Sequence, residues 1–279
     1  MKKLLALMAL GLSACFMLSA AQAGSTLDRV KQTGVVRNVL FNDYPPFSYL
    51  DDKNQLVGFD VDVSNAVAQK LGARLELATP GWETIVGGKW QGRWDMCICS
   101  MTPNAERAKV LDFATPYYST FAVLIVHKDE KNIQSAADLS NKKVGLGLGS
   151  SYENYLNKSL AIPGGKPIAF PFDHVQAVPT DEEMAFRNLA LGPGKRLDAV
   201  ISDRITAKPR IEKLPQLRIL QELYAEPNWI AVDKGDPEWS KTLADAITAL
   251  RADGTLKAIS MKCLVKTSPG SPRNVAFVR

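Results

Sequence analysis

The chain alternates short apolar runs with amphipathic stretches, the pattern of strands followed by helices. Val35–Phe41 predicts a strand, which ends at the two prolines of NDYPPFSY. NQLVGFDVDVSNAVAQKLG then predicts a short strand and a helix with Val63, Val67 and Leu71 on one face. Two more strands are predicted at RLELATP (74–80) and WDMCICSMT (94–102), with a short helix at WETIVGGKWQG (82–92) between them.

The same rhythm restarts after the extended segment DFATPYYSTFAVLIVHKDE (112–130). The second pass predicts a helix and strand at 135–149, a helix at 152–160, a strand at 166–172, a helix at 181–192 and a strand running into a helix at 196–207. Two closing helices follow at 238–254 and 255–264, the first with an apolar stripe of Trp239, Leu243, Ile247 and Leu250. This order predicts an α/β fold with mostly parallel sheets, in two lobes separated by a cleft.

Residues 1–23 have the charged start, apolar run and Ala21-Gln22-Ala23 ending of a secretory signal peptide. Leu12-Ser13-Ala14-Cys15 offers an alternative, a lipoprotein signal with Cys15 lipidated. The apolar residues that follow Cys15 favour cleavage after Ala23 and release into the periplasm.

Cleavage after Ala23 leaves 256 residues and lowers the formal net charge from +5 to +3, because Lys2 and Lys3 are lost and no acidic residue is. So small a charge does not indicate a nucleic-acid partner. The size favours two lobes over a single core.

Three cysteines remain in that chain. Cys97 and Cys99 should leave one face of a strand about 7 Å apart, which disfavours a bridge between them. A bridge from either one to Cys263 stays open. His127 and His174 lack partners at ligand spacing, so we expect neither a metal nor a cofactor.

The stretch KKVGLGLGSSYENYL (142–156) combines a strand, alternating glycines and a helix start. Its G-x-G-x-G spacing does not match the dinucleotide fingerprint, and no G-K-[ST] follows. Ser150 and Glu153 have capping-box spacing, so free N–H groups near Ser150, Ser151 and Tyr152 could bind an anion. A turn without a ligand is the alternative.

Two further groups lie at strand ends. In CSMTPNAERAK, Thr102 is a candidate helix cap, and Arg107 could meet an anion held by the hydroxyls of Ser100 and Thr102. The alternative for Arg107 is a surface ion pair. Asp203, after a buried strand, could bind an ammonium group or simply cap the next helix.

The order of YPPFSYLDDKNQLVGFDVDV, WDMCICSMTPNAERAKVLDFATPYY, KVGLGLGSS, LDAVISD and LRADGTLKAI resembles the periplasmic amino-acid-binding proteins of ABC importers, solute-binding family 3. The resemblance implies a type II periplasmic binding protein fold, with residues 24–120 and 225–279 in one lobe and 121–224 in the other. It also implies a monomer that delivers a free amino acid to a membrane permease and is not an enzyme.

The resemblance also implies roles for the residues at the strand ends. Arg107, Thr102 and Ser151 would hold the ligand carboxylate, Asp203 and Ser100 its ammonium group, and Tyr44 and Trp82 its side chain. Members that bind basic amino acids carry an acid where this chain has Phe41. That departure argues against a basic ligand, although Asp43, Glu83 or Glu226 could supply an acid instead.

Two other functions use a similar scaffold. A cyclohexadienyl dehydratase would need a carboxylic acid poised for general acid catalysis, for which Glu83, Glu226 or Asp203 are candidates. A ligand-sensing module of a membrane receptor is the third possibility.

Overall fold

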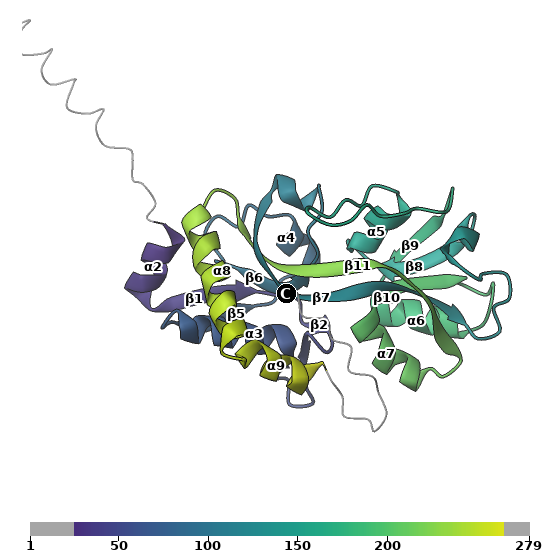
Figure 1. Ribbon diagram of the computed structural model, residues 1–279. Coiled ribbons are helices and arrows are strands. Elements are labelled where there is room, and N and C mark those ends of the chain that lie inside the picture. The colour runs from purple at the N-terminus through teal and green to yellow at the C-terminus, as the bar shows by residue number, and fades with distance from the viewer. Residues whose placement is uncertain (1–24, 265–279) are drawn as a thin grey trace, which may run out of the picture.

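The computed structural model describes residues 25–264 as two lobes at the two ends of a pair of long strands (Figure 1). The predicted signal peptide, with Cys15, lies outside the described residues. Within residues 25–264, no helix has the length and apolar character needed to cross a membrane.

The first lobe is built mainly from the N-terminal part of the chain and is completed by the last two helices of the described residues. Its elements are α2 (Thr26–Thr33), β1 (Val35–Val39), β2 (Asp43–Tyr44), β3 (Ser48–Leu50), β4 (Leu56–Val57), α3 (Phe59–Lys70), β5 (Arg74–Ala78), α4 (Trp82–Val86), β6 (Cys97–Met101), η1 (Arg107–Lys109), α8 (Pro237–Ala252) and α9 (Thr255–Cys263). As predicted, the apolar stripe of α8 is buried, and it packs in one core with Val63 and Val67 of α3. Burial of these stripes, rather than helix propensity, holds the three helices in place.

The second lobe consists of η2 (Ala136–Leu139), β8 (Lys143–Gly147), α5 (Ser151–Leu156), β9 (Gln176–Thr180), α6 (Glu182–Ala190), β10 (Ala199–Asp203) and α7 (Arg204–Lys213). Its strands β10, β8 and β9 run parallel. The predicted strand at 166–172 is wrong, since that segment forms no strand and the edge strand β9 comes later. Pro167 and Pro171 cannot donate to a sheet, and Phe170 and Phe172 instead pack against Tyr155.

The lobes are joined by β7 (Leu111–His127) and β11 (Leu217–Asp233), which pair antiparallel along their lengths (Figure 1). The main sheet has the order β6-β11-β7-β10-β8-β9, so it spans both lobes and is mixed. The predicted two-lobed α/β fold is confirmed, but the main sheet is mixed rather than mostly parallel. The prediction rested on the βα alternation and gave no strand to residues 217–233, which form β11. The small parallel pair β1-β5 and the sheet β2-β3-β4 belong to the first lobe.

Candidate functional site

A cavity of about 370 Å³ lies between the lobes. The nine side chains predicted to bind a ligand all line it: Tyr44, Trp82, Ser100, Thr102, Arg107, Ser150, Ser151, Tyr152 and Asp203. Phe41, Cys99 and Glu226 also line it, as do residues at the start of α6. The cavity meets the carboxyl ends of β6, β8 and β10, where α/β proteins hold ligands.

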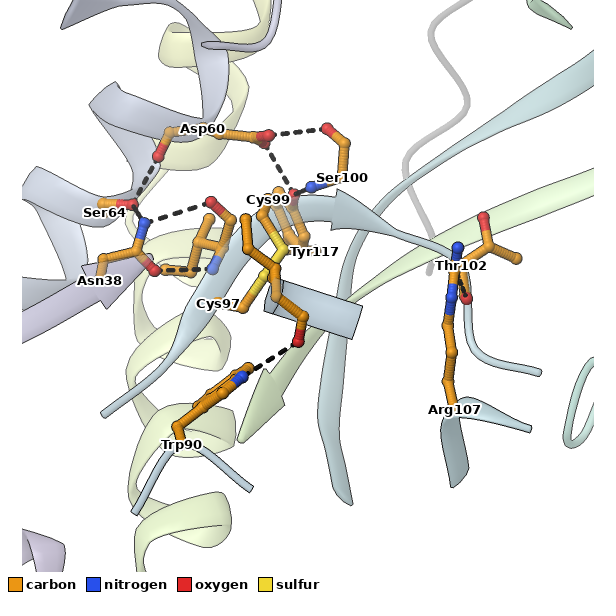
Figure 2. The surroundings of a disulfide bond; sticks show 12 residues. Asn38, Asp60, Ser64, Trp90, Cys97, Cys99, Ser100, Thr102, Arg107 and Tyr117 are labelled. Atoms are coloured by element: carbon orange, nitrogen blue, oxygen red, sulfur yellow. Dashed lines mark hydrogen bonds between the residues drawn. A yellow bond between two sulfur atoms is a disulfide. The ribbon is translucent and has the colours of Figure 1, made fainter. Parts of the chain in front are cut away.

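The end of β6 is shaped by a bulge closed by a disulfide between Cys97 and Cys99 (Figure 2). Cys97 pairs with Ala231 and Met101 with Trp229, so three residues of β6 face one residue of β11. The bulge brings the two cysteine Cα atoms to 5.2 Å, within disulfide range. The prediction that these cysteines do not pair is therefore wrong, because it assumed a regular strand.

Buried polar side chains satisfy the backbone of this bulge (Figure 2). Asn38 accepts a hydrogen bond from the Ile98 N–H at 2.7 Å and donates to the Ile98 carbonyl at 3.3 Å. The Tyr117 hydroxyl accepts from the Ser100 N–H at 2.7 Å and donates to Asp60. These contacts hold Ser100 at φ 54°, a left-handed conformation that few non-glycine residues adopt. Bulges beside binding sites commonly redirect a side chain in this way.

Removing the bridge should cost stability. We expect the double variant Cys97→Ala, Cys99→Ala to lose about 1–2 kcal/mol of unfolding free energy, a small loss because the closed loop is short. Thermal unfolding with and without a reductant measures it: the wild type should lose stability on reduction, and the double variant should not. Cys263→Ser is the control, since Cys263 is free. If alkylation under denaturing, non-reducing conditions finds all three cysteines of the chain from residue 24 reactive, the bridge is refuted.

Ser100 already has a partner for its own hydroxyl. Its Oγ donates to Oδ2 of Asp60 at 2.7 Å, and the second oxygen of Asp60 accepts from Tyr117. Burial raises the pKa of Asp60 to about 7, although both hydrogen bonds oppose the shift. Because its proton is already used, the Ser100 hydroxyl can only accept a hydrogen bond from a further partner, through its lone pairs.

Arg107 is buried at the boundary between the lobes. It opens the short 3₁₀ helix η1, so the predicted helix capped by Thr102 is not formed; Asn104 instead accepts from the Arg107 N–H at 2.8 Å. The guanidinium donates to the carbonyl of Thr102 at 2.7 Å and to that of Gly149 in the second lobe at 3.0 Å. Burial lowers the pKa of Arg107 to about 10, which still leaves it charged at neutral pH.

The glycine-rich stretch lies against Arg107 and lines the cavity from the second lobe. Gly149 has φ 68°, and its carbonyl also accepts from the indole of Trp82 at 3.2 Å. Ser150 occupies the N-cap position of α5, as predicted, but its side chain makes no capping bond, so the predicted capping box with Glu153 is wrong. The Ser150 hydroxyl is instead buried without a hydrogen-bond partner, beside the cavity. Such a group gains most from a ligand that can bond to it.

Asp203 is both a helix cap and a cavity residue. Its Oδ1 accepts from the N–H groups of Ile205 at 2.6 Å and Thr206 at 3.0 Å. Burial and the nearby Glu226 raise its pKa to about 8, although the capping bonds oppose the shift. The capping alternative is therefore confirmed, and it leaves the second carboxylate oxygen without a role in the cap.

Glu226 is a buried cavity residue that the nine predicted residues did not include. It lies on β11, opposite Thr120 of β7, and accepts hydrogen bonds from the hydroxyls of Thr102, Ser151 and Tyr152 at 2.9, 2.8 and 3.0 Å. Burial raises its pKa. The sequence offered it only as one of several possible acids, because no strand was predicted around it.

Two aromatic rings complete the walls. Tyr44 stacks on Phe47 with ring centroids 5.2 Å apart, and the ring of Trp82 lies 5.4 Å from the Arg107 guanidinium. Contacts within the protein thus fix both rings, which form a rigid apolar surface beside the charged side chains of the cavity. Among the described residues, no group of His, Cys, Asp and Glu side chains could hold a metal ion.

Comparisons with known proteins agree with this architecture. Residues 36–266 match the family model of bacterial extracellular solute-binding proteins, family 3. The L-cystine-binding protein TcyJ of Escherichia coli is 31% identical over 266 residues, which cover 93% of each chain. The L-arginine-binding protein of Pseudomonas aeruginosa is 30% identical, over 78% of this chain and 83% of its own.

Two solved structures illustrate the similarity in three dimensions. A mutant of the arginine-binding protein of T. maritima superposes with a TM-score of 0.72 at 28% identity, over 85% of this chain and 98% of its own. The ancestral amino acid-binding protein AncCDT-1, a precursor of cyclohexadienyl dehydratase, superposes with a TM-score of 0.72 at 29% identity. This match covers 86% of this chain and 100% of the AncCDT-1 chain. The chain therefore belongs to family 3 of the bacterial extracellular solute-binding proteins, which capture solutes for ABC importers.

Proposed function

We propose that this protein captures a free amino acid in the interlobe cavity, in the periplasm and as a monomer, and delivers it to an ABC permease. One observation carries the proposal: a buried guanidinium, Arg107, and a buried carboxylate, Asp203, face the same cavity from different lobes. An amino acid carries the complementary pair of charges on one carbon atom. The unpartnered Ser150 hydroxyl supplies a further hydrogen bond for its carboxylate.

Closure of the two lobes follows from this division of the site. Arg107 and Ser100 come from the first lobe, and Ser150 and Asp203 from the second, so a ligand that contacts both sets favours the closed state. We place the lobe boundaries at residues 24–120 with 225–279, and at 121–224; residues 24 and 265–279 of these ranges lie outside the part of the chain that the structure describes. The hinge then lies in β7 and β11, the strands that run from one lobe to the other.

A dehydratase is the second candidate. Glu226 is a buried acid with a raised pKa beside the cavity, as a general acid requires. The named relatives TcyJ and the P. aeruginosa protein are binding proteins, which supports binding without turnover. AncCDT-1 is itself described as amino acid-binding, although it precedes an enzyme.

The test is thermal unfolding of the chain from residue 24 against the common amino acids, after unfolding and refolding to remove any bound ligand. At 100 times its dissociation constant, a ligand should add about 2.7 kcal/mol. For a chain of this size that raises the midpoint by about 5–10 °C. A panel without any shift, together with turnover of prephenate, would replace binding by the dehydratase reaction.

A further inference from the structure

Glu226 occupies the position where the resemblance places the ligand carboxylate. The hydroxyls of Thr102 and Ser151, expected to donate to the ligand, donate instead to Oε1 of Glu226. The Tyr152 hydroxyl donates to Oε2. The protein thus carries a carboxylate of its own between the first lobe and the N-terminus of α5.

Arg107 does not fully offset this carboxylate. It attracts Glu226 electrostatically, but its two recorded hydrogen bonds go to the carbonyl oxygens of Thr102 and Gly149. A guanidinium has five N–H donors, so others remain for a ligand carboxylate, together with the unpartnered Ser150 hydroxyl. Glu226 therefore occupies two of the hydroxyl groups expected to bind the ligand carboxylate. Hydrogen-bond donors of Arg107 and Ser150 remain for that carboxylate.

The charges around the cavity are unequal. Arg107 is the only basic residue among the described residues that line it, whereas six lining residues are acidic: Asp43, Glu83, Asp181, Glu182, Asp203 and Glu226. A neutral amino acid, with one positive and one negative group, complements Arg107 and Asp203 alone. Glu226 then remains as a second buried carboxylate that needs a positive charge.

We propose that Glu226 makes the cavity selective for a cationic amino acid, one that carries a second basic group. The inference rests on the proposed function, and it names the class of ligand. Glu226 and Asp203 both face the cavity, and a cation between them would relieve their mutual repulsion. The raised pKa values of both carboxyl groups agree with a site that lacks this charge in its unliganded form.

The test compares ligands matched in shape but not in charge. We expect calorimetry on the ligand-free protein to show binding of L-arginine at least tenfold tighter than of L-citrulline, and of L-lysine at least tenfold tighter than of L-norleucine. Glu226→Gln should reduce both preferences by tenfold or more, since the amide keeps an acceptor for the hydroxyls and loses the charge. Glu222→Gln is the control, because it lies on the same strand and is exposed.

Each other outcome overturns a defined part of this inference. Equal affinity for L-arginine and L-citrulline in the wild type refutes the charge selection and leaves amino-acid binding intact. Agmatine binding as tightly as L-arginine would refute an amino acid as the ligand, although selection for a cation would stand. Binding of none of these compounds refutes selection for a cationic amino acid, whereas the thermal-unfolding panel of common amino acids decides separately whether the protein binds an amino acid. The wild-type comparison does not depend on the fold of the Glu226→Gln variant.

Discussion

Asp203→Asn should weaken binding of the amino acid by about 2–5 kcal/mol, because the ligand ammonium group would lose its buried charged partner. That is a factor of about 30 to several thousand in the dissociation constant. The fold should survive the change. Asn caps helices as well as Asp does, and the two backbone N–H groups of α7 need only an acceptor oxygen. Calorimetry with the amino acid found by thermal unfolding measures the loss.

Asp236→Asn is the matched control, since Asp236 caps α8 through the Trp239 N–H at 2.9 Å and is not among the residues that line the cavity. Its ligand affinity should equal that of the wild type. Wild-type affinity in Asp203→Asn would remove Asp203 from the site.

The same variant tests the raised pKa of Asp203. Because this pKa is about 8 in the folded protein and near 4 in an unfolded chain, the folded state binds the proton more tightly. The unfolding free energy of the ligand-free protein should therefore fall as the pH rises from about 4 to about 8. Asp203→Asn should make this decline smaller without abolishing it, because burial also raises the pKa values of Asp60 and Glu226. Midpoints of both proteins at pH 5 and pH 9 would show the difference. A decline of equal size in the variant would assign it to other groups.

Much of the cavity could be predicted from the sequence because its residues stand at strand ends and helix starts. Ser100, Ser150 and Asp203 each follow an apolar run, and runs of this kind form strands whose carboxyl ends meet at one edge of a sheet. The stripe on α8 was equally clear, since its period of 3.6 residues is a local signal. Neither inference needs a contact between distant parts of the chain.

Glu226 and the disulfide depend on such contacts. Glu226 reaches the cavity because β11 pairs with β7, more than a hundred residues earlier in the chain. The bridge between Cys97 and Cys99 forms because β6 bulges against β11 and buried side chains hold the bulge. The local sequence pattern of neither segment reveals the strand with which it pairs. A regular strand was therefore predicted around Cys97 and Cys99, and no strand was predicted around Glu226.

Arg107→Met should abolish discrimination between an amino acid and its decarboxylated amine. In the wild type we expect the amine to bind about 2–5 kcal/mol more weakly, since Arg107 loses the carboxylate it would otherwise contact. In the variant the two ligands should bind within about 0.5 kcal/mol of one another. Arg37→Met is the control, because this half-buried arginine of β1 pairs with Asp95 and neither residue lines the cavity.

The comparison of the amino acid with its amine is needed because Arg107 also has a structural role. It joins the lobes through the Gly149 carbonyl, so a variant without it loses stability whether or not a ligand carboxylate ever contacts the guanidinium. Weaker binding alone would not separate the two roles. The difference between the two ligands does separate them, since a loss of stability weakens both equally and cancels. If Arg107→Met still prefers the amino acid over the amine by the wild-type margin, Arg107 holds the lobes together and the carboxylate is bound elsewhere.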